Sequence, residues 1–194
     1  MRVIAGTAKG RTLVAPAGSG TRPATDRVRE TLLGILEPGL AEAKVLDLFA
    51  GAGTLGIEAL SRGAAHATFV ERSSAAVEAL RKNITSTGFA DRAAVIAANV
   101  IAFLDRGEPA GPYDLVFVDP PFADVAVLEA VLAHPALAAA LTADATVVAR
   151  ILRKHRPALP EGVAVARTKE IGEEDLLFLR YERARMRPGP ERHG

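Results

Sequence analysis

The tetrapeptide Asp119-Pro120-Pro121-Phe122 follows directly after the apolar run 113–118. Two consecutive prolines lack a backbone N–H, so the segment offers carbonyl oxygens without competing donors. A carboxylate, proline carbonyls and an aromatic ring at the end of a strand suit a flat base with an exocyclic amine. The amine would donate to Asp119 and to a proline carbonyl, while Phe122 stacks on the ring. The alternative is that the two prolines merely end a strand.

A second motif, residues 47–56, links an apolar strand to the helix that follows it. Its glycines at 51, 53 and 56 satisfy the pattern G-x-G-x-x-G, and Glu71 lies about twenty residues on, at the end of the next strand. This pattern predicts a nucleotide-like ligand at the loop. It does not distinguish between cofactors, because a nicotinamide-binding protein would show it too.

Asp47 favours one class of cofactor. A dinucleotide places its pyrophosphate at this turn, where a carboxylate would repel it. S-adenosylmethionine carries an ammonium group and no phosphate, and Glu71 could accept hydrogen bonds from both ribose hydroxyls. Asp47 could instead only cap the turn. We expect a methyl-donor site formed by Asp47, Phe49, Ala50, Gly51, Gly53, Thr54, Leu55, Glu71, Arg72, Asn99 and Val100.

Asn99 and Val100 follow the third expected strand, at the place where an adenine ring would lie if the strands align side by side. Asn99 could bind the edge of the ring, and Val100 could pack on its face. Asn99 is equally well explained as the N-cap of a short helix.

Composition excludes several kinds of chemistry. The 194 residues include no cysteine, so disulfides, thiolate zinc sites and thiol nucleophiles are excluded. The four histidines are scattered without the spacing of metal ligands, and we expect no metal site. No run approaches the ~20 apolar residues of a membrane span, and the N-terminus lacks the apolar core of a signal peptide. We therefore expect a cytoplasmic protein without membrane contact, and a monomer.

The net charge of +1 conceals basic ends. Such ends flanking a balanced middle indicate contact with a polyanion, although a solvated basic surface would look the same. The candidate RNA-binding residues are Arg2, Lys9, Arg11, Arg22 and Arg27.

The order of elements predicts an α/β fold with a mostly parallel sheet that ends in an antiparallel hairpin. We expect an N-terminal β-hairpin extension over residues 1–22, a main domain over 23–186 and a disordered tail over 187–194. The extension is expected to pair strands 2–5 and 11–15. Further strands are expected at 45–48, 67–71, 93–97, 113–118, 145–149, 163–168 and 176–181, and helices at 26–36, 54–61, 73–86, 100–105, 125–133 and 135–141.

The motifs together resemble those of class I amino-methyltransferases, whose Rossmann-like fold agrees with this order. More narrowly, the segments 22–32, 47–53 and 117–122 resemble the signatures of the RsmD-type family. The resemblance implies S-adenosylmethionine as cofactor, Asp119, Pro120, Pro121 and Phe122 as catalytic residues, and 16S ribosomal RNA or the assembling small ribosomal subunit as partner. It also implies methylation of the N2 amine of guanine 966.

The chain departs from that family at two places. The family commonly has a glutamate at the end of the fifth strand, where Arg150 stands here, and the segment 151–156 is unusually basic. The loop 171–175 is more acidic than expected. These departures concern the rim that faces the target, not the methyl-donor site.

Other functions remain open. A small-molecule methyltransferase would leave the segment 119–122 and the basic ends without a purpose, and a non-catalytic RNA-binding module would explain only the basic ends. A DNA adenine-N6 methyltransferase would use the same chemistry, but such enzymes usually carry a target-recognition domain for which this chain has little room. A nucleotide-cofactor oxidoreductase would explain the glycine loop but not Asp47. A C5-cytosine methyltransferase is excluded because it requires a cysteine nucleophile.

Overall fold

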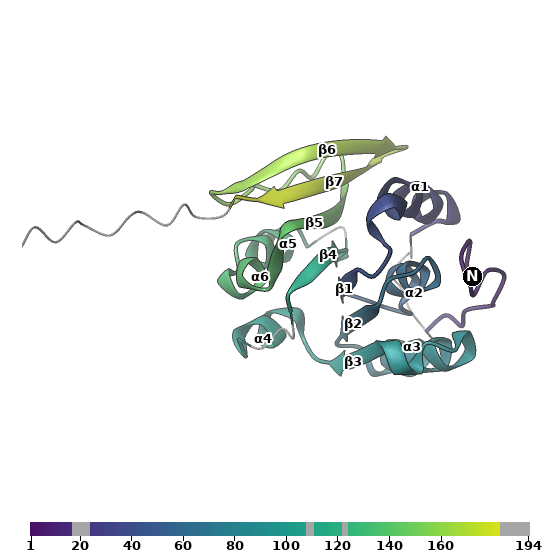
Figure 1. Ribbon diagram of the computed structural model, residues 1–194. Helices are drawn as coiled ribbons and strands as arrows, with labels where there is room; N and C mark the ends of the chain where they lie inside the picture. Colours follow the sequence, from purple (N-terminus) through teal and green to yellow (C-terminus); the bar gives the residue numbers. More distant parts are fainter. Residues whose placement is uncertain (17–23, 108–110, 122–123, 183–194) are drawn as a thin grey trace, which may run out of the picture.

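The computed structural model describes residues 1–16, 24–107, 111–121 and 124–182. These residues form a seven-stranded sheet with the order β3-β2-β1-β4-β5-β7-β6 (Figure 1). The first five strands are parallel, whereas β7 is antiparallel to both β5 and β6. The strands are β1 (Lys44–Leu48), β2 (His66–Glu71), β3 (Ala93–Ala97), β4 (Tyr113–Val118), β5 (Leu141–Leu152), β6 (Val163–Ile171) and β7 (Glu174–Tyr181).

Helices cover both faces of the sheet, as parallel strands require. Figure 1 shows α1, α2 and α3 on one face and α4, α5 and α6 on the other. The helices are α1 (Asp26–Leu36), α2 (Thr54–Ser61), α3 (Ser74–Thr87), α4 (Val100–Asp105), α5 (Val125–Leu132) and α6 (Pro135–Ala139), and two short 3-10 turns lie at Glu37–Gly39 and Ala90–Arg92.

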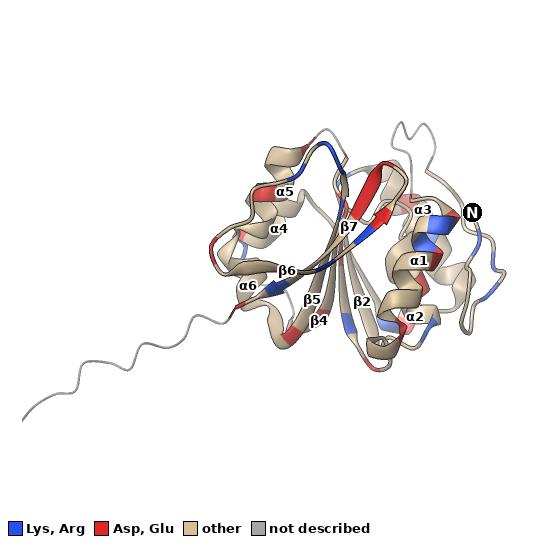
Figure 2. Cartoon of the chain, turned by 90° about the horizontal axis from the view of Figure 1, so that it is seen from above, with Lys and Arg blue, Asp and Glu red and all other residues tan. Residues whose placement is uncertain are grey.

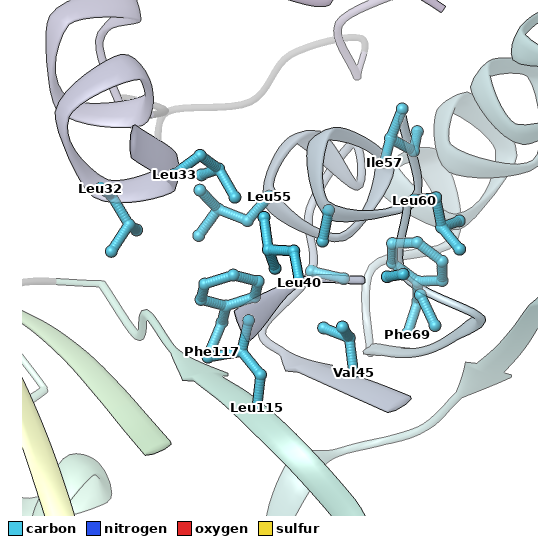
Figure 3. Packing of buried hydrophobic residues seen from close by; sticks show 14 of the residues in the cluster. Leu32, Leu33, Leu40, Val45, Leu55, Ile57, Leu60, Phe69, Leu115 and Phe117 are labelled. Atoms are coloured by element: carbon cyan, nitrogen blue, oxygen red, sulfur yellow. The ribbon is translucent and has the colours of Figure 1, made fainter. Parts of the chain in front are cut away.

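The two faces have separate hydrophobic cores because side chains alternate along each strand. Val45 belongs to the core under α1, α2 and α3, while Leu46 and Leu48 belong to the core under α4, α5 and α6. Figure 3 shows the first core, in which Leu33 and Leu55 lie between α1 and α2, above Phe117 of β4.

Most of the expected elements are confirmed among the described residues. The bounds of α2, β3, α4 and β4 agree with those expected, and Thr25 caps α1 through a hydrogen bond from the Val28 N–H. The α/β fold with its antiparallel C-terminal hairpin is therefore correct. The expected tail at 187–194 lies outside the described residues.

The expected extent of several elements was wrong. The strand expected at 145–149 is twelve residues long, since β5 starts at Leu141, where the last helix was expected to end, and continues to Leu152 through pairing with β7. Both hairpin strands are also longer than expected, so only Gly172 and Glu173 separate them. The N-terminal segment does fold back on itself, but its pairing is reduced to one bridge between Arg2 and Thr12.

Arg29 of α1 joins the N-terminal segment to the main domain. Its fully buried guanidinium lies 3.2 Å from Glu58 of α2 and 2.7 Å from Asp26, and it donates to the Arg2 carbonyl at 3.1 Å. Glu58 also accepts a hydrogen bond from the Ile4 N–H. Arg27 and Glu30 on the same helix are both exposed.

Replacing Arg29 by methionine should lower the free energy of unfolding by about 3–5 kcal/mol, because the buried Glu58 carboxylate loses its closer cation and keeps only Arg62, at 3.6 Å. Urea unfolding of both proteins measures this difference. The matched control is Lys82→Met, which breaks the exposed pair with Glu78 and should change stability little. Equal effects of the two substitutions would contradict a structural role for the buried pair.

Candidate functional site

Parallel pairing brings the ends of the central strands to one edge of the sheet. Leu48 of β1 is paired with Val70 of β2 on one side and with Val118 of β4 on the other. The residues that follow these three positions therefore leave the sheet side by side. In an open parallel sheet, ligands bind at the carboxyl edge of the strands, and this edge carries both sequence motifs.

The loop between β1 and α2 has an unusual backbone. Phe49, Gly51 and Gly53 all have positive φ angles, of 66°, 55° and 80°. This region is costly for a residue with a side chain, so Phe49 stores strain of about 1–3 kcal/mol. A Cβ atom at Gly51 would meet nothing within 4 Å, whereas one at Gly53 would overlap Leu80. Gly51 therefore borders open space, and Gly53 is required by packing.

Glu71, at the end of β2, is bound to this loop. One carboxylate oxygen accepts from the Gly51 N–H at 2.9 Å, and the other accepts from the Ser73 N–H at 2.7 Å. The side chain is half-buried, and each oxygen retains capacity for a second hydrogen bond. Glu71 thus lies beside the open side of the glycine loop, where a ribose could reach it.

Asp47 lies in a different environment from the one its sequence position indicated. Its neighbours in register are Phe69 and Phe117, so its side chain shares an apolar row on the α2 face of the sheet. Its Oδ2 accepts from the Gly56 N–H at 3.0 Å, and only 2% of the residue is exposed. The Asp47 carboxyl therefore accepts a hydrogen bond from a backbone amide at the turn, as in the alternative interpretation of the sequence.

Burial raises the pKa of Asp47 from 3.8 to about 8. The hydrogen bond from Gly56 opposes this rise, while the charges of Asp119 and Glu71 add to it. The carboxyl is thus largely protonated at neutral pH, and charge repulsion of a pyrophosphate is weaker than the sequence implied. Asp47 disfavours a phosphate in another way, because it occupies an N–H in the first turn of α2 that a phosphate would use.

The residues after β4 present one carboxylate and one open carbonyl. Asp119 is 16% exposed at its side chain and Pro120 is buried. The Pro121 carbonyl accepts from the Asp124 N–H at 2.8 Å, whereas no donor to the Pro120 carbonyl is found among the described residues. Pro120 is therefore the proline carbonyl with capacity for a ligand. Phe122 lies outside the described residues.

Arg150 of β5 contacts Asp119, and the sequence did not predict this contact. Its Nε donates to Asp119 Oδ1 at 2.8 Å, and its Nη1 donates to Glu174 of β7 at 3.2 Å. Arg150 had been noted as a departure from the family, but its partner was not foreseen. Only the pairing of β5 with both β4 and β7 could have indicated this contact. That pairing depends on the full length of β5, which was predicted too short.

The basic segment 151–156 and the acidic hairpin form ion pairs with each other. Arg153 and Arg156 both bind Asp175, which is fully buried, at 3.0 and 3.1 Å. Figure 2 shows the basic residues after β5 and the acidic residues of the β6–β7 hairpin at the same end of the molecule. The basic segment is thus largely neutralised by the acidic hairpin.

The other expected donor contacts remain predictions, and the structure limits some of them. Asn99 caps α4, since its Oδ1 accepts from the N–H groups of Ile101 and Ala102. Val100 and Leu55 are packed in the two cores, so only a small part of each could touch a ligand. Of the remaining positions, Thr54 and Ala50 are buried and Arg72 is exposed.

The N-terminal segment carries the expected RNA-binding side chains on its surface. Arg2, Lys9 and Arg11 are exposed, as is Arg27 on α1, while Arg22 lies outside the described residues. The segment is docked on the main domain rather than free, because Asn83 of α3 donates to both the Val14 and Ala52 carbonyls. One end of the extension therefore lies beside the glycine loop.

The described part of the chain lacks two kinds of feature. It contains no group of three or more histidine, aspartate or glutamate side chains arranged to hold a metal ion. None of its helices has the length and apolarity needed to cross a membrane.

The strand order, the antiparallel β7 and the glycine loop at the carboxyl edge define the class I methyltransferase fold. The family model described as Conserved hypothetical protein 95 matches residues 1–180. The chain belongs to this family, which is the RsmD-type methyltransferase family that its motifs resemble.

Relatives support this membership. The chain is 48% identical over 122 residues to ribosomal RNA small subunit methyltransferase D of Escherichia coli K12 and 42% identical over 123 residues to the Haemophilus influenzae protein of the same name. Each match covers 63% of this chain, and the chain spans 60% and 64% of those relatives. The solved structure of Escherichia coli yhhF superimposes with a TM-score of 0.80 at 36% identity, over 94% of this chain and 98% of that one.

Asp47 predicts an unusual dependence of stability on pH. The unfolded chain releases this proton near pH 4, whereas the native state keeps it to about pH 8. The native state therefore binds more protons in this interval, and the free energy of unfolding should fall as pH rises, by up to about 1.4 kcal/mol per pH unit from this group.

Urea unfolding between pH 5 and pH 8 compares the wild type with Asp47→Asn, which keeps the shape but cannot titrate. The variant should lose this part of the pH dependence, so its stability should gain on that of the wild type as pH rises. Asp91→Asn, at an exposed carboxylate, is the control and should leave the slope unchanged. Parallel curves for the wild type and Asp47→Asn would refute the buried proton.

Proposed function

We propose that this protein transfers the methyl group of S-adenosylmethionine to the exocyclic N2 amine of a guanine in 16S ribosomal RNA. By resemblance, the target is guanine 966 of the small ribosomal subunit. The observation that carries the proposal is the placement of two hydrogen-bond acceptors, Asp119 Oδ2 and the Pro120 carbonyl, beside the glycine loop at one edge of the sheet. Relatives named as ribosomal RNA small subunit methyltransferases support the substrate class.

The residues present fit a methyl donor. The open side of Gly51 admits close approach of a ligand, and the Glu71 carboxylate beside it suits two vicinal hydroxyls. Asn99 retains its amide N–H groups for the edge of a base, because only its Oδ1 serves as the cap. The bound donor supplies a methyl group on a sulfonium, which is already an activated leaving group.

The acceptor motif would orient the guanine amine. The lone pair on N2 is delocalised into the ring, so the amine is a poor nucleophile in its planar form. Hydrogen bonds from its two protons to Asp119 and the Pro120 carbonyl would draw the nitrogen toward tetrahedral geometry, with its lone pair facing the methyl carbon. A C–N bond forms as the C–S bond breaks, and one amine proton leaves to Asp119 or to water. Positioning of this kind can lower a barrier by ~7–11 kcal/mol.

Phe122 would hold the base by stacking after the base leaves its own stack. Unstacking costs a few kcal/mol in structured nucleic acid, and an aromatic clamp would offset part of this cost. This role rests on the sequence, because Phe122 lies outside the described residues.

Substitutions at the two acidic positions should separate donor binding from methyl transfer. Asp119→Ala removes an acceptor for the amine, and kcat should fall at least ~100-fold while the Kd for S-adenosylmethionine changes little. Glu71→Ala removes hydrogen bonds to a charged acceptor, and that Kd should rise ~10- to 100-fold.

Calorimetry with S-adenosylmethionine measures the Kd, and transfer of a radiolabelled methyl group to unmodified small-subunit particles measures kcat. Loss of donor binding in Asp119→Ala would show that Asp119 holds the cofactor instead of the target. Mapping the labelled nucleotide tests the guanine assignment. Label on adenine N6 in DNA would favour the alternative methyltransferase, and heat of binding with NAD alone would favour an oxidoreductase.

The basic N-terminal surface should contribute to RNA affinity through phosphate contacts. Deleting this segment is a poor test, because Val3 and Leu13 are buried in the core. The double substitution Lys9→Gln/Arg11→Gln instead removes two exposed charges. It should weaken binding and reduce the slope of log K against log salt by roughly 1–2.

Filter binding of small-subunit RNA between 50 and 200 mM salt, the range over which such contacts lose roughly 10³–10⁵ in affinity, measures this slope. The matched control is Arg167→Gln/Lys169→Gln, which removes two exposed charges from the edge strand β6. Equal slopes for the wild type and the N-terminal variant would remove this surface from the RNA interface.

A further inference from the structure

We propose that Arg150 is a positioning residue that holds Asp119 in the orientation needed to bind the target amine, with Glu174 as its anchor. This inference rests on the proposed role of Asp119 as the amine acceptor. It assigns a function to a position where the chain departs from its family, and it joins the C-terminal hairpin to the reacting group.

The geometry carries the inference. Arg150 binds Asp119 through Nε at 2.8 Å and Glu174 through Nη1 at 3.2 Å, so the guanidinium bridges β4 and β7 from the strand between them. The three side chains are only 10%, 16% and 20% exposed. A planar guanidinium with two fixed partners cannot rotate without breaking one of them. Arg150 therefore restricts the rotation of the Asp119 carboxylate.

The contact leaves the second oxygen of Asp119 for substrate. Arg150 engages Oδ1, and within the described part of the chain no donor reaches Oδ2. The proposed reaction needs a single carboxylate oxygen, because the second amine proton goes to the Pro120 carbonyl. An oriented acceptor needs one carboxylate oxygen held by the protein and the other facing the substrate. Asp119 meets this requirement with Oδ1 bound to Arg150 and Oδ2 available to the amine.

Charge gives Arg150 a second effect on the same group. Burial raises the pKa of Asp119, and the Arg150 cation and its hydrogen bond oppose that rise. Among the other charged groups nearby, Glu174 raises the pKa of Asp119, and the charge of Asp119 in turn raises the pKa of Asp47 of β1. Arg150 is the cation among them, so its removal should favour the neutral acid, which is a weaker acceptor.

The wider network explains how the anchor is held. Glu174 is the first residue of β7, and the next residue, Asp175, is fully buried against Arg153 and Arg156. The basic segment after β5 thus binds the start of β7, and β7 presents Glu174 to Arg150. The acidic hairpin and the basic segment are therefore linked to Asp119 through Glu174 and Arg150.

The experiment compares Arg150→Met, Arg150→Lys and the wild type in methyl transfer across pH. Arg150→Met should lower kcat ~10- to 100-fold, as misplacement of a reacting group does, and should move the acid limb of the kcat profile to higher pH. Arg150→Lys keeps the charge but loses the planar fork, so it should restore the acid limb and only part of kcat. The Kd for S-adenosylmethionine should stay within twofold throughout.

The matched control is Arg180→Met, which removes a cation of β7 that donates to the Asp144 and Ala145 carbonyls and not to Asp119. It should leave the acid limb where it is in the wild type. A structural role for Arg150 alone would change thermal stability without moving the acid limb. An Arg150→Met protein with an unchanged pH profile and a kcat within twofold of wild type would overturn the proposal.

A titration without substrate separates this proposal from the proposed function. The carboxyl ¹³C shift of Asp119, assigned with Asp119→Asn, should titrate at higher pH in Arg150→Met than in the wild type. If wild-type protein transfers no methyl group to small-subunit RNA, the proposed function fails. An unshifted titration of Asp119 in Arg150→Met overturns the positioning role whether or not transfer is observed.

Discussion

The pairing of β1 with both β2 and β4 is the constraint on which the site depends. Leu48 has partners on either side, so the glycine loop, Glu71 and Asp119 leave the sheet at the same level. None of these groups could meet another if the register slipped by one residue, because a slip would turn each side chain to the opposite face. The two apolar cores fix that register, since Val45 and Leu46 must enter different cores.

Much of this arrangement could be predicted from the sequence because local patterns and tertiary structure agree. Helix α2 begins after Gly53, where the left-handed backbone and the close approach of Leu80 each favour glycine, and its bounds were correct. Strand β5 was predicted too short because its local pattern does not agree with the tertiary structure. Its first residues, Leu141 to Asp144, lack the apolar run of a buried strand, and of these only Leu141 pairs with β4 before the register shifts. Long-range pairing of this kind leaves no signal in a local window.

The same limit explains what the sequence left open at the site. The type of residue at Asp47 and its distance from the glycines indicated an acidic group near the ligand, but not which face of β1 it occupied. Its partners Phe69 and Phe117 come from two other strands, and they make it a buried, protonated carboxyl. The Arg150–Asp119 contact was likewise invisible because 31 positions separate the two residues along the chain. Sequence showed which groups were present, and the fold determined their charge state.

The charge of Asp119 affects the protonation of Asp47. Asp119 raises the pKa of Asp47. The Arg150 cation opposes the rise that burial causes in the pKa of Asp119. Two buried acids at one edge of a sheet cannot both ionise at low cost unless a cation lies between them or a cationic ligand arrives. Arg150 contacts Asp119 and not Asp47, so this cation favours the negative charge on Asp119 and leaves the proton on Asp47.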